Sequence, residues 1–241
     1  MAALSLFVSM WMICSLNDVK VMQIFKQDMM QAYEISDLRL LNHFLDIEVS
    51  QVEEGIFISQ KKYTRSILQK FKMMDCRSMA IPLAANEKFR KDDREKKANS
   101  SLYGSLIGSL LYLTSIRPET MFTASLLSRF MQEPSQVYFG AAKRVLRYLQ
   151  GKMDYGIMYK FGGDLNLIGY PDSDWAGSID DMKSTSSYAF SFGSSICSWL
   201  SKKQSVVAQS TVEADYISVD KATAQAIWLR RIFEDICQKQ K

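Results

Sequence analysis

The alternation of apolar and polar residues between positions 44 and 73 predicts a β-hairpin followed by a short helix. Two β-branched runs, FLDIEVSQV and GIFISQ, flank the turn residues Glu53, Glu54 and Gly55, and glycine can adopt a positive φ there. The following segment, KKYTRSILQKFKM, has apolar residues at helical spacing. Upstream, residues 17–35 show a similar spacing, so we expect a further helix before the hairpin.

Residues 101–150 carry a helical pattern throughout. The stretch LYGSLIGSLLYLTS is apolar on nearly all sides, which predicts a buried helix, and its Gly104 and Gly108 favour close helix packing over a membrane dimer face. Pro118 suits the first turn of the next helix. In AAKRVLRYLQ an inward stripe is expected from Ala142, Val145, Leu146 and Leu149.

The pattern changes on either side of this helical segment. Residues 82–99 mix charges with few apolar positions, which predicts a solvated linker. From residue 165 we expect a strand, LNLIGYPDS, then a hairpin centred on Gly193, then a long helix with Ser210 or Thr211 as N-cap. A strand, a hairpin and a helix in this order begin an α/β arrangement.

The first 16 residues, MAALSLFVSMWMICSL, contain no charged residue. No Lys or Arg precedes this run and no A-x-A site follows it, so a secretory signal peptide is disfavoured. A bilayer span needs about 20 apolar residues. A buried strand is the preferred interpretation, and we expect no membrane contact.

Composition and charge exclude several classes of function. Apolar residues make up 47% of the 241 residues and charged residues 23%, as in globular domains, and the net charge of +4 permits nucleic-acid binding without requiring it. The four cysteines lie far apart and His43 is the only histidine, so a Cys/His zinc site and a Ser/His/Asp triad are disfavoured. Scattered cysteines suit a reducing compartment, which favours the cytoplasm or nucleus over secretion.

Two carboxylates are candidates for metal chemistry. Asp172 follows the apolar run at 165–170, and Glu213 lies in the first turn of the last helix. If this helix begins above the end of the strand, the two carboxylates approach each other and offer oxygen ligands to Mg²⁺. Acidic residues at a helix start also complement the helix dipole, so by spacing alone the pair is a weak signal.

Basic residues supply candidates for nucleic-acid binding. Lys143, Arg144 and Arg147 are expected on the outer face of one helix, and Lys202 and Lys203 follow the second hairpin. A solvated helix face would have the same composition and is the commoner case.

Several long motifs resemble the Pol polyproteins of copia-type LTR retrotransposons. YPDSDWAGSIDDMKSTSSYAFSFG, ICSWLSKKQSVVAQSTVEADYIS and AIWLRRIF are similar to the ribonuclease H domain of that family. SDLRLLNHFLDIEV, GIFISQKKYTRSIL, SLYGSLIGSLLYLTSIRPE and AAKRVLRYLQGKMDYGI are similar to the last part of its reverse transcriptase. The resemblance extends over nearly the whole chain.

The resemblance implies a fold and four segments. We expect an α+β or α/β protein with a reverse-transcriptase palm-end hairpin and a helical thumb-like region, followed by an incomplete ribonuclease H-like α/β domain. The segments are 1–81, a palm remnant with the hairpin; 82–99, a charged linker; 100–160, the helical C-terminal region of the reverse transcriptase; and 161–241, the truncated ribonuclease H-like domain.

The resemblance also implies roles for individual residues. Asp172 stands at the first metal-binding Asp of the ribonuclease H site and Glu213 at its Glu, whereas Asp174 and Asp215 accompany them and are not expected to be ligands. No Cys-Asp-Asn stretch follows the last helix, so the metal cage is at best half present. The Asp-bearing strand becomes an open sheet edge that favours self-association.

The polymerase motif departs further from the family. Where the family has an aromatic residue, Val and two Asp, this chain has Phe7, Val8, Ser9 and Met10. Neither a hydroxyl nor a thioether replaces the two lost carboxylates as Mg²⁺ ligands. Smaller departures are Ser187 in place of Gly and Val212 in place of Thr.

The resulting expectation is a non-catalytic Pol remnant that binds RNA–DNA hybrid or duplex weakly, without a resident cofactor. One alternative is residual Mg²⁺-dependent ribonuclease H activity with acids supplied by a partner chain. Another is a secreted effector, because the residues Arg144 to Arg147, RVLR, match the R-x-L-R string of oomycete effectors. Such a string belongs in a disordered stretch soon after a signal peptide, and here it lies on a predicted helix. A folded interaction module without a nucleic-acid role is a fourth alternative.

Overall fold

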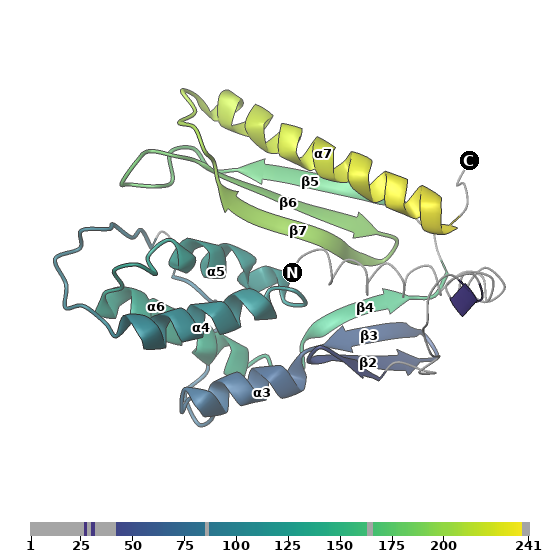
Figure 1. Ribbon diagram of the computed structural model, residues 1–241, viewed down its shortest axis with the longest axis horizontal. Coiled ribbons are helices and arrows are strands. Elements are labelled where there is room, and N and C mark those ends of the chain that lie inside the picture. Colours follow the sequence, from purple (N-terminus) through teal and green to yellow (C-terminus); the bar gives the residue numbers. More distant parts are fainter. Residues whose placement is uncertain (1–26, 28–29, 32–41, 85–86, 163–165, 238–241) are drawn as a thin grey trace.

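The computed structural model describes residues 42–84, 87–162 and 166–237, together with residues 27, 30 and 31. It is a mixed α+β structure in which two sheets lie one above the other beside a helical region (Figure 1). The predictions for residues 1–16, including Phe7, Val8, Ser9 and Met10, lie outside the described part of the chain. Residues 27, 30 and 31 are helical, in agreement with the helix predicted for 17–35.

The first sheet has the strand order β1-β2-β3-β4, and all neighbours are antiparallel. Its strands are β1 (His43–Phe44), β2 (Ile47–Val52), β3 (Gly55–Ser59) and β4 (Gly156–Lys160). The predicted hairpin is confirmed, because Val52 pairs with Gly55 across the two-residue turn. Gly55 also lies against β4, where a Cβ would overlap the carbonyl oxygen of Tyr159. The close approach of β4 therefore requires glycine at this position.

The helices predicted within 101–150 are confirmed, but the segment expected to be helical up to residue 160 ends in the strand β4, which pairs with β3. The helical region consists of α3 (Lys61–Lys70), α4 (Ser100–Leu113), the 3-10 helix η1 (Pro118–Thr120), α5 (Met121–Ser128) and α6 (Gln136–Gln150). Asn99 caps α4, since its side-chain oxygen accepts the N–H of Leu102 at 2.9 Å. The core face of α4 is fully buried and comprises Tyr103, Leu106, Ile107, Leu110 and Leu113.

Two expectations for this region need correction. A Cβ at Gly108 would meet nothing within 4 Å, and one at Gly104 would meet only the Met131 side chain at 3.7 Å, so the glycines do not serve close helix packing. The 82–99 segment is not wholly solvated, because Phe89 is buried and its ring packs edge-on against Phe130 and Tyr138. The segment is therefore attached to the helical core.

The second sheet contains β5 (Leu167–Ser173), β6 (Thr185–Phe192) and β7 (Ser195–Lys203) in this order, all antiparallel. The hairpin at Gly193 is confirmed, and Gly193 has a φ of 60° that favours glycine. The long helix α7 (Thr211–Cys237) lies along β5 (Figure 1). The ring of Phe233 on α7 stacks on Phe192 of β6 with centroids 4.2 Å apart, which identifies the face of the sheet that α7 covers.

One hydrophobic core joins the two sheets. It contains Ile58 and Tyr159 from the first sheet and Phe190, Phe192 and Leu229 from the second sheet and α7. A separate core lies within the helical region. Among the described residues, no helix has both the length and the apolar composition of a membrane span.

Candidate functional site

Asp172 lies near the end of β5, on the sheet face opposite α7. It pairs with Ser187 of β6, which pairs with Ser201 of β7, and the hydroxyls of Ser187 and Ser201 are hydrogen-bonded at 3.2 Å. Directly paired residues on neighbouring strands share a face. The next residue, Ser173, faces α7, because its hydroxyl donates to Asp215 Oδ1 at 2.6 Å. Since side chains alternate along a strand, the Asp172 carboxylate is directed away from α7.

Glu213 belongs to the N-terminal cap of α7. Ser210 Oγ accepts the N–H of Glu213 at 3.1 Å, which confirms Ser210 as the N-cap residue. The Glu213 carboxylate in turn accepts the N–H of Gln209 at 2.7 Å through Oε2. This reciprocal arrangement resembles a capping box, in which the third helical residue reaches back over the helix start. The described hydrogen bonds therefore do not bring Glu213 and Asp172 together.

Asp215 is the acid of α7 that contacts the strand carrying Asp172. Asp215 accepts the hydroxyl of Ser173. On the same side of the helix, the hydroxyl of Ser218 donates to the carbonyl oxygens of Asp172 at 2.6 Å and Ser187 at 3.2 Å. The sequence pattern indicates that Asp215 faces the sheet, because Asp215, Ser218 and the buried Ala222 follow the i, i+3, i+7 spacing of one helix face.

Asp174 and Asp181 take part in a charged cluster between α5 and the second sheet. Asp174 Oδ1 accepts the N–H of Thr185, and Arg129 Nη2 donates to the Thr185 hydroxyl at 3.2 Å. Burial lowers the pKa of the Arg129 guanidinium, and the charges of Asp174 and Asp181 oppose that effect. Lys203 Nζ donates to Asp181 Oδ2 at 2.8 Å. Burial acts to raise the pKa of Asp181, but hydrogen bonds from Lys203 and Ser178 outweigh it and leave that pKa at about 2.

The basic residues of α6 are only partly free. Lys143 is exposed, with its ammonium 4.6 Å from the centroid of the Phe139 ring. Arg147 is half-buried and its Nε donates to the carbonyl of Arg77 at 2.9 Å, so this side chain holds the loop after α3. Arg144 is also half-buried, and its Nε has no hydrogen-bond partner among the described residues.

The basic residues of β7 point to opposite faces of the sheet. Lys203 is engaged by Asp181 on the face opposite α7. Lys202 is exposed and lies on the α7 side close to Lys221. Burial lowers the pKa of Lys221, and the positive charge of Lys202 lowers it further. Lys202 and Lys143 are thus the predicted basic residues with the most accessible charges.

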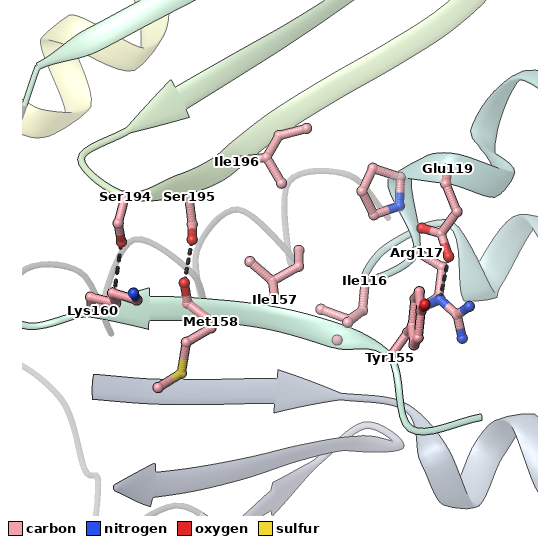
Figure 2. A pocket seen from close by; sticks show the side chains of 12 residues that line it. Ile116, Arg117, Glu119, Tyr155, Ile157, Met158, Lys160, Ser194, Ser195 and Ile196 are labelled. Carbon is pink, nitrogen blue, oxygen red and sulfur yellow. Dashed lines mark hydrogen bonds and ion pairs between the residues drawn. The ribbon is translucent and has the colours of Figure 1, made fainter. Parts of the chain in front are cut away.

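A pocket of about 450 Å³ lies between η1, β4 and the β6–β7 turn (Figure 2). At one end, Arg117 is buried and its Nε donates to Glu119 at 2.6 Å, with the Tyr155 ring centroid 5.8 Å from the guanidinium carbon. At the other end the N–H of Lys160 donates to Ser194 Oγ at 3.0 Å. The Arg117–Glu119 pair is local to η1, whereas the Lys160–Ser194 bond connects β4 of the first sheet to the β6–β7 turn of the second. Within residues 42–84, 87–162 and 166–237, no group of three or more His, Cys, Asp or Glu side chains forms an arrangement that could hold a metal ion.

Comparison with known proteins connects this chain to retrotransposons. Residues 3–85 match the reverse transcriptase (RNA-dependent DNA polymerase) family. The chain is 34% identical over 220 residues to the retrovirus-related Pol polyprotein from transposon RE2 of Arabidopsis thaliana, covering 91% of this chain and 15% of the polyprotein. The chain thus spans about a seventh of such a polyprotein.

Two shorter relatives are covered almost completely. An uncharacterised mitochondrial protein of Arabidopsis thaliana is 32% identical over 216 residues, covering 89% of this chain and 88% of that protein. The secreted RxLR effector protein 161 of Plasmopara viticola is 41% identical over 128 residues, covering 53% of this chain and 90% of that protein. No solved structure matches.

Proposed function

The chain belongs to the family of retrovirus-related Pol polyproteins of copia-type retrotransposons, and from this premise we propose that it is a non-catalytic Pol remnant that binds nucleic acid weakly. The observation that carries the proposal is the separation of the two predicted metal ligands. Asp172 faces away from α7, and Glu213 caps the start of that helix. Two-metal phosphodiester cleavage requires several converging acids, and these two do not converge.

The order of elements supports a ribonuclease H-like origin for the C-terminal part. A strand that carries Asp172 as its penultimate residue, a hairpin and a long helix follow one another and pack together, as the resemblance implied. The sheet has three described strands, all antiparallel, with β5 at its edge. This arrangement agrees with the strand, hairpin and helix that begin a ribonuclease H-like domain.

Weak nucleic-acid binding follows from the state of the basic residues. Lys143 and Lys202 have accessible ammonium groups, whereas Arg147 and Lys203 are bonded within the molecule. Each phosphate that a lysine neutralises releases counterions, so affinity falls as salt concentration rises. Because only two of the predicted basic residues are free, we expect their electrostatic contribution to be small and sequence-independent.

A cleavage assay tests the loss of catalysis. An RNA–DNA hybrid is incubated with Mg²⁺ and either the wild-type chain, Asp172→Asn or Glu213→Gln. We expect no metal-dependent cleavage by any of the three. Cleavage by the wild type that disappears in Asp172→Asn would overturn the non-catalytic assignment.

A binding titration tests the nucleic-acid role separately. We expect salt-sensitive binding of a labelled hybrid, and we expect the double variant Lys143→Gln/Lys202→Gln to reduce the slope of log affinity against log salt by about 2. Lys62→Gln is the matched control, because Lys62 is an exposed lysine on α3 that this proposal does not use. A slope unchanged by the double variant, or no binding at low salt, would remove the nucleic-acid role and favour an interaction module.

A second candidate is residual Mg²⁺-dependent ribonuclease H activity with acids from a partner chain. Asp215 favours it, because its carboxylate lies beside Ser173, the neighbour of Asp172. A rearrangement of the end of β5 would bring two acids onto one side. If this candidate is correct, cleavage rises steeply with protein concentration, is lost in Asp215→Asn and persists in Glu213→Gln.

The third candidate, a secreted effector, rests on the name of the Plasmopara viticola relative and on the RVLR string. The string lies in the middle of α6, and both Val145 and Leu146 are fully buried. Recognition of the string would therefore require α6 to unfold. Detection of a secreted chain processed at its N-terminus would favour this candidate.

A further inference from the structure

The open edge of the second sheet presents unpaired backbone groups. Among the described strands, β5 has β6 as its one neighbour. Asp174 donates its N–H to Thr185 at 3.1 Å and Asn166 accepts the N–H of Gly193 at 3.3 Å, so even-numbered residues bond to β6. Because peptide groups alternate along a strand, the outward N–H and C=O groups belong to the odd-numbered residues of β5. The outward residues are Leu167, Gly169, Pro171 and Ser173.

An exposed apolar stripe runs along α7 beside this edge. It consists of Val212, Tyr216, Val219, Thr223 and Ile227, which are spaced by four, three, four and four residues and so lie on one side of the helix. The exposed fractions of its apolar members are 60%, 73%, 45% and 49%. We call these five residues the α7 stripe. Apolar side chains gathered in this way indicate an interaction surface.

The α7 stripe lies on the β5 side of the helix. Asp215 contacts Ser173 of β5, whereas Gln225 Nε2 donates to Ser198 Oγ of β7 at 3.2 Å. Because an α-helix turns by about 100° per residue, Asp215 lies between the α7 stripe and the helix face that points to β7. The stripe therefore projects beyond β5, above the open edge. A strand added to β5 would place one row of its side chains against the stripe.

We propose that this surface pairs with the same surface of a second copy of the chain, through antiparallel pairing of β5 with β5. A two-fold axis through Tyr170, the middle of β5, aligns the outward residues of both strands over their full length. The start of α7 lies at the end of β5, because Asp215 bonds to Ser173. The end of α7 lies at the start of β5, because Phe233 stacks on Phe192, the partner of Leu167. The helix therefore runs antiparallel to the strand. The middle of α7, near Thr223, therefore lies close to the same axis.

The α7 stripe is complementary to itself about this axis, which is why the proposed occupant is a second copy. Val219 of one copy lies opposite Ile227 of the other, so these two apolar side chains cover each other. Tyr216 lies opposite Arg230, and an exposed guanidinium against an aromatic ring is favourable. The same surface patch on both partners is the requirement for a closed two-fold dimer. The helices pack side by side on one face of a sheet that is continuous through both copies.

Pro171 moderates the association. It is one of the outward residues and has no N–H, so each copy lacks one donor along the shared edge. The missing donor leaves an acceptor of the other copy without a partner. We therefore expect a dimer that forms in a concentration-dependent manner. This inference is independent of the proposed function, since it rests on β5 and α7 alone.

The first test is the oligomeric state of the full chain by sedimentation velocity over a concentration series. We expect a monomer–dimer equilibrium for the wild type and a monomer for Val219→Asp. Val137→Asp is the control: Val137 is a valine of α6 with 41% exposure, against 45% for Val219, and it lies outside the proposed surface, so no effect on association is expected. A wild-type chain that stays monomeric, or a Val219→Asp variant that associates like the wild type, would overturn the proposal.

The second test locates the axis. With the predicted pairing, Tyr170 faces Tyr170 of the second copy in a non-hydrogen-bonded pair, with Cα atoms about 4.5 Å apart and within reach of a disulfide. We expect Tyr170→Cys to form a 170–170 disulfide under mild oxidation, identified by mass spectrometry. Ile168→Cys, also exposed on the same strand, is expected to give no 168–168 link. A 168–168 link, or no link in either variant, would overturn the proposed pairing.

Discussion

Glu213 and Asp215 are only two residues apart, and the helix gives them different roles. Two residues correspond to a rotation of about 200°, so the side chains leave α7 on opposite sides. Glu213 turns back to the helix start and accepts the N–H of Gln209, whereas Asp215 faces β5 and accepts the hydroxyl of Ser173. Similarity to a motif assigns a role to each acid, but the helical period decides which acid contacts the strand.

The cap of α7 gives a prediction at this scale. Ser210→Ala removes the acceptor for the N–H of Glu213, and we expect it to lower the free energy of unfolding by about 1 kcal/mol. Urea denaturation followed by circular dichroism measures the change. Val212→Ala, an exposed position in the same turn, is the control and is expected to change stability by much less. Equal stability of Ser210→Ala and wild type would show that the cap does not hold in solution.

Asp181 gives a pH-dependent prediction. Its folded pKa of about 2 lies below its usual 3.8, so the charged form is favoured in the folded state. The stabilisation is therefore fully present above 3.8 and is lost as pH falls towards about 2. We expect the stability difference between wild type and Asp181→Asn to be constant near neutral pH and to shrink over this acidic window. A difference that is independent of pH would contradict the ion pair with Lys203.

At the scale of elements, the sequence predicted what depends on local periodicity. The hairpin at Gly55, the helix α3, the buried α4 and the inward stripe of α6 are confirmed. It did not predict β4, a five-residue strand inside a segment expected to be helical, because the partner strand β3 is about a hundred residues away. Strand pairing over such a distance leaves no local signal in the sequence. The directions of the Asp172 and Glu213 side chains could not be predicted either, because they depend on the register of β5 and on the cap of α7.

The inward stripe of α6 gives a prediction for an element. Leu146 is fully buried in the helical core, so Leu146→Ala removes apolar contacts and leaves a cavity. We expect the free energy of unfolding to fall by about 2–5 kcal/mol. Val137→Ala on the exposed side of the same helix is the control, with an expected change of less than about 1 kcal/mol. Similar losses for both variants would mean that α6 does not pack as described.

At the scale of the whole molecule, segments predicted as separate share one core. The boundary expected between residues 160 and 161 separates Tyr159 from Phe190 and Leu229, yet these side chains pack in the same cluster. Tyr159 also donates its hydroxyl to the carbonyl of Ile196 at 2.8 Å. A change of family motif along a chain marks its ancestry, whereas a folding boundary depends on where apolar surface is buried. The sequence therefore indicates the ancestry of each segment but does not indicate where one folding unit ends and the next begins.

The shared core leads to a prediction about cooperativity. Trp199 of β7 donates its indole N–H to the carbonyl of Thr114, after α4, at 2.8 Å, and so connects the second sheet to the helical region. We expect tryptophan fluorescence and far-ultraviolet circular dichroism to report one common unfolding transition, since neither sheet buries its inner face alone. Trp199→Phe keeps an aromatic ring but loses the hydrogen bond, and we expect the free energy of unfolding measured by circular dichroism to fall by about 1 kcal/mol. Two separate transitions in the wild type would show that the second sheet and α7 fold independently of the rest.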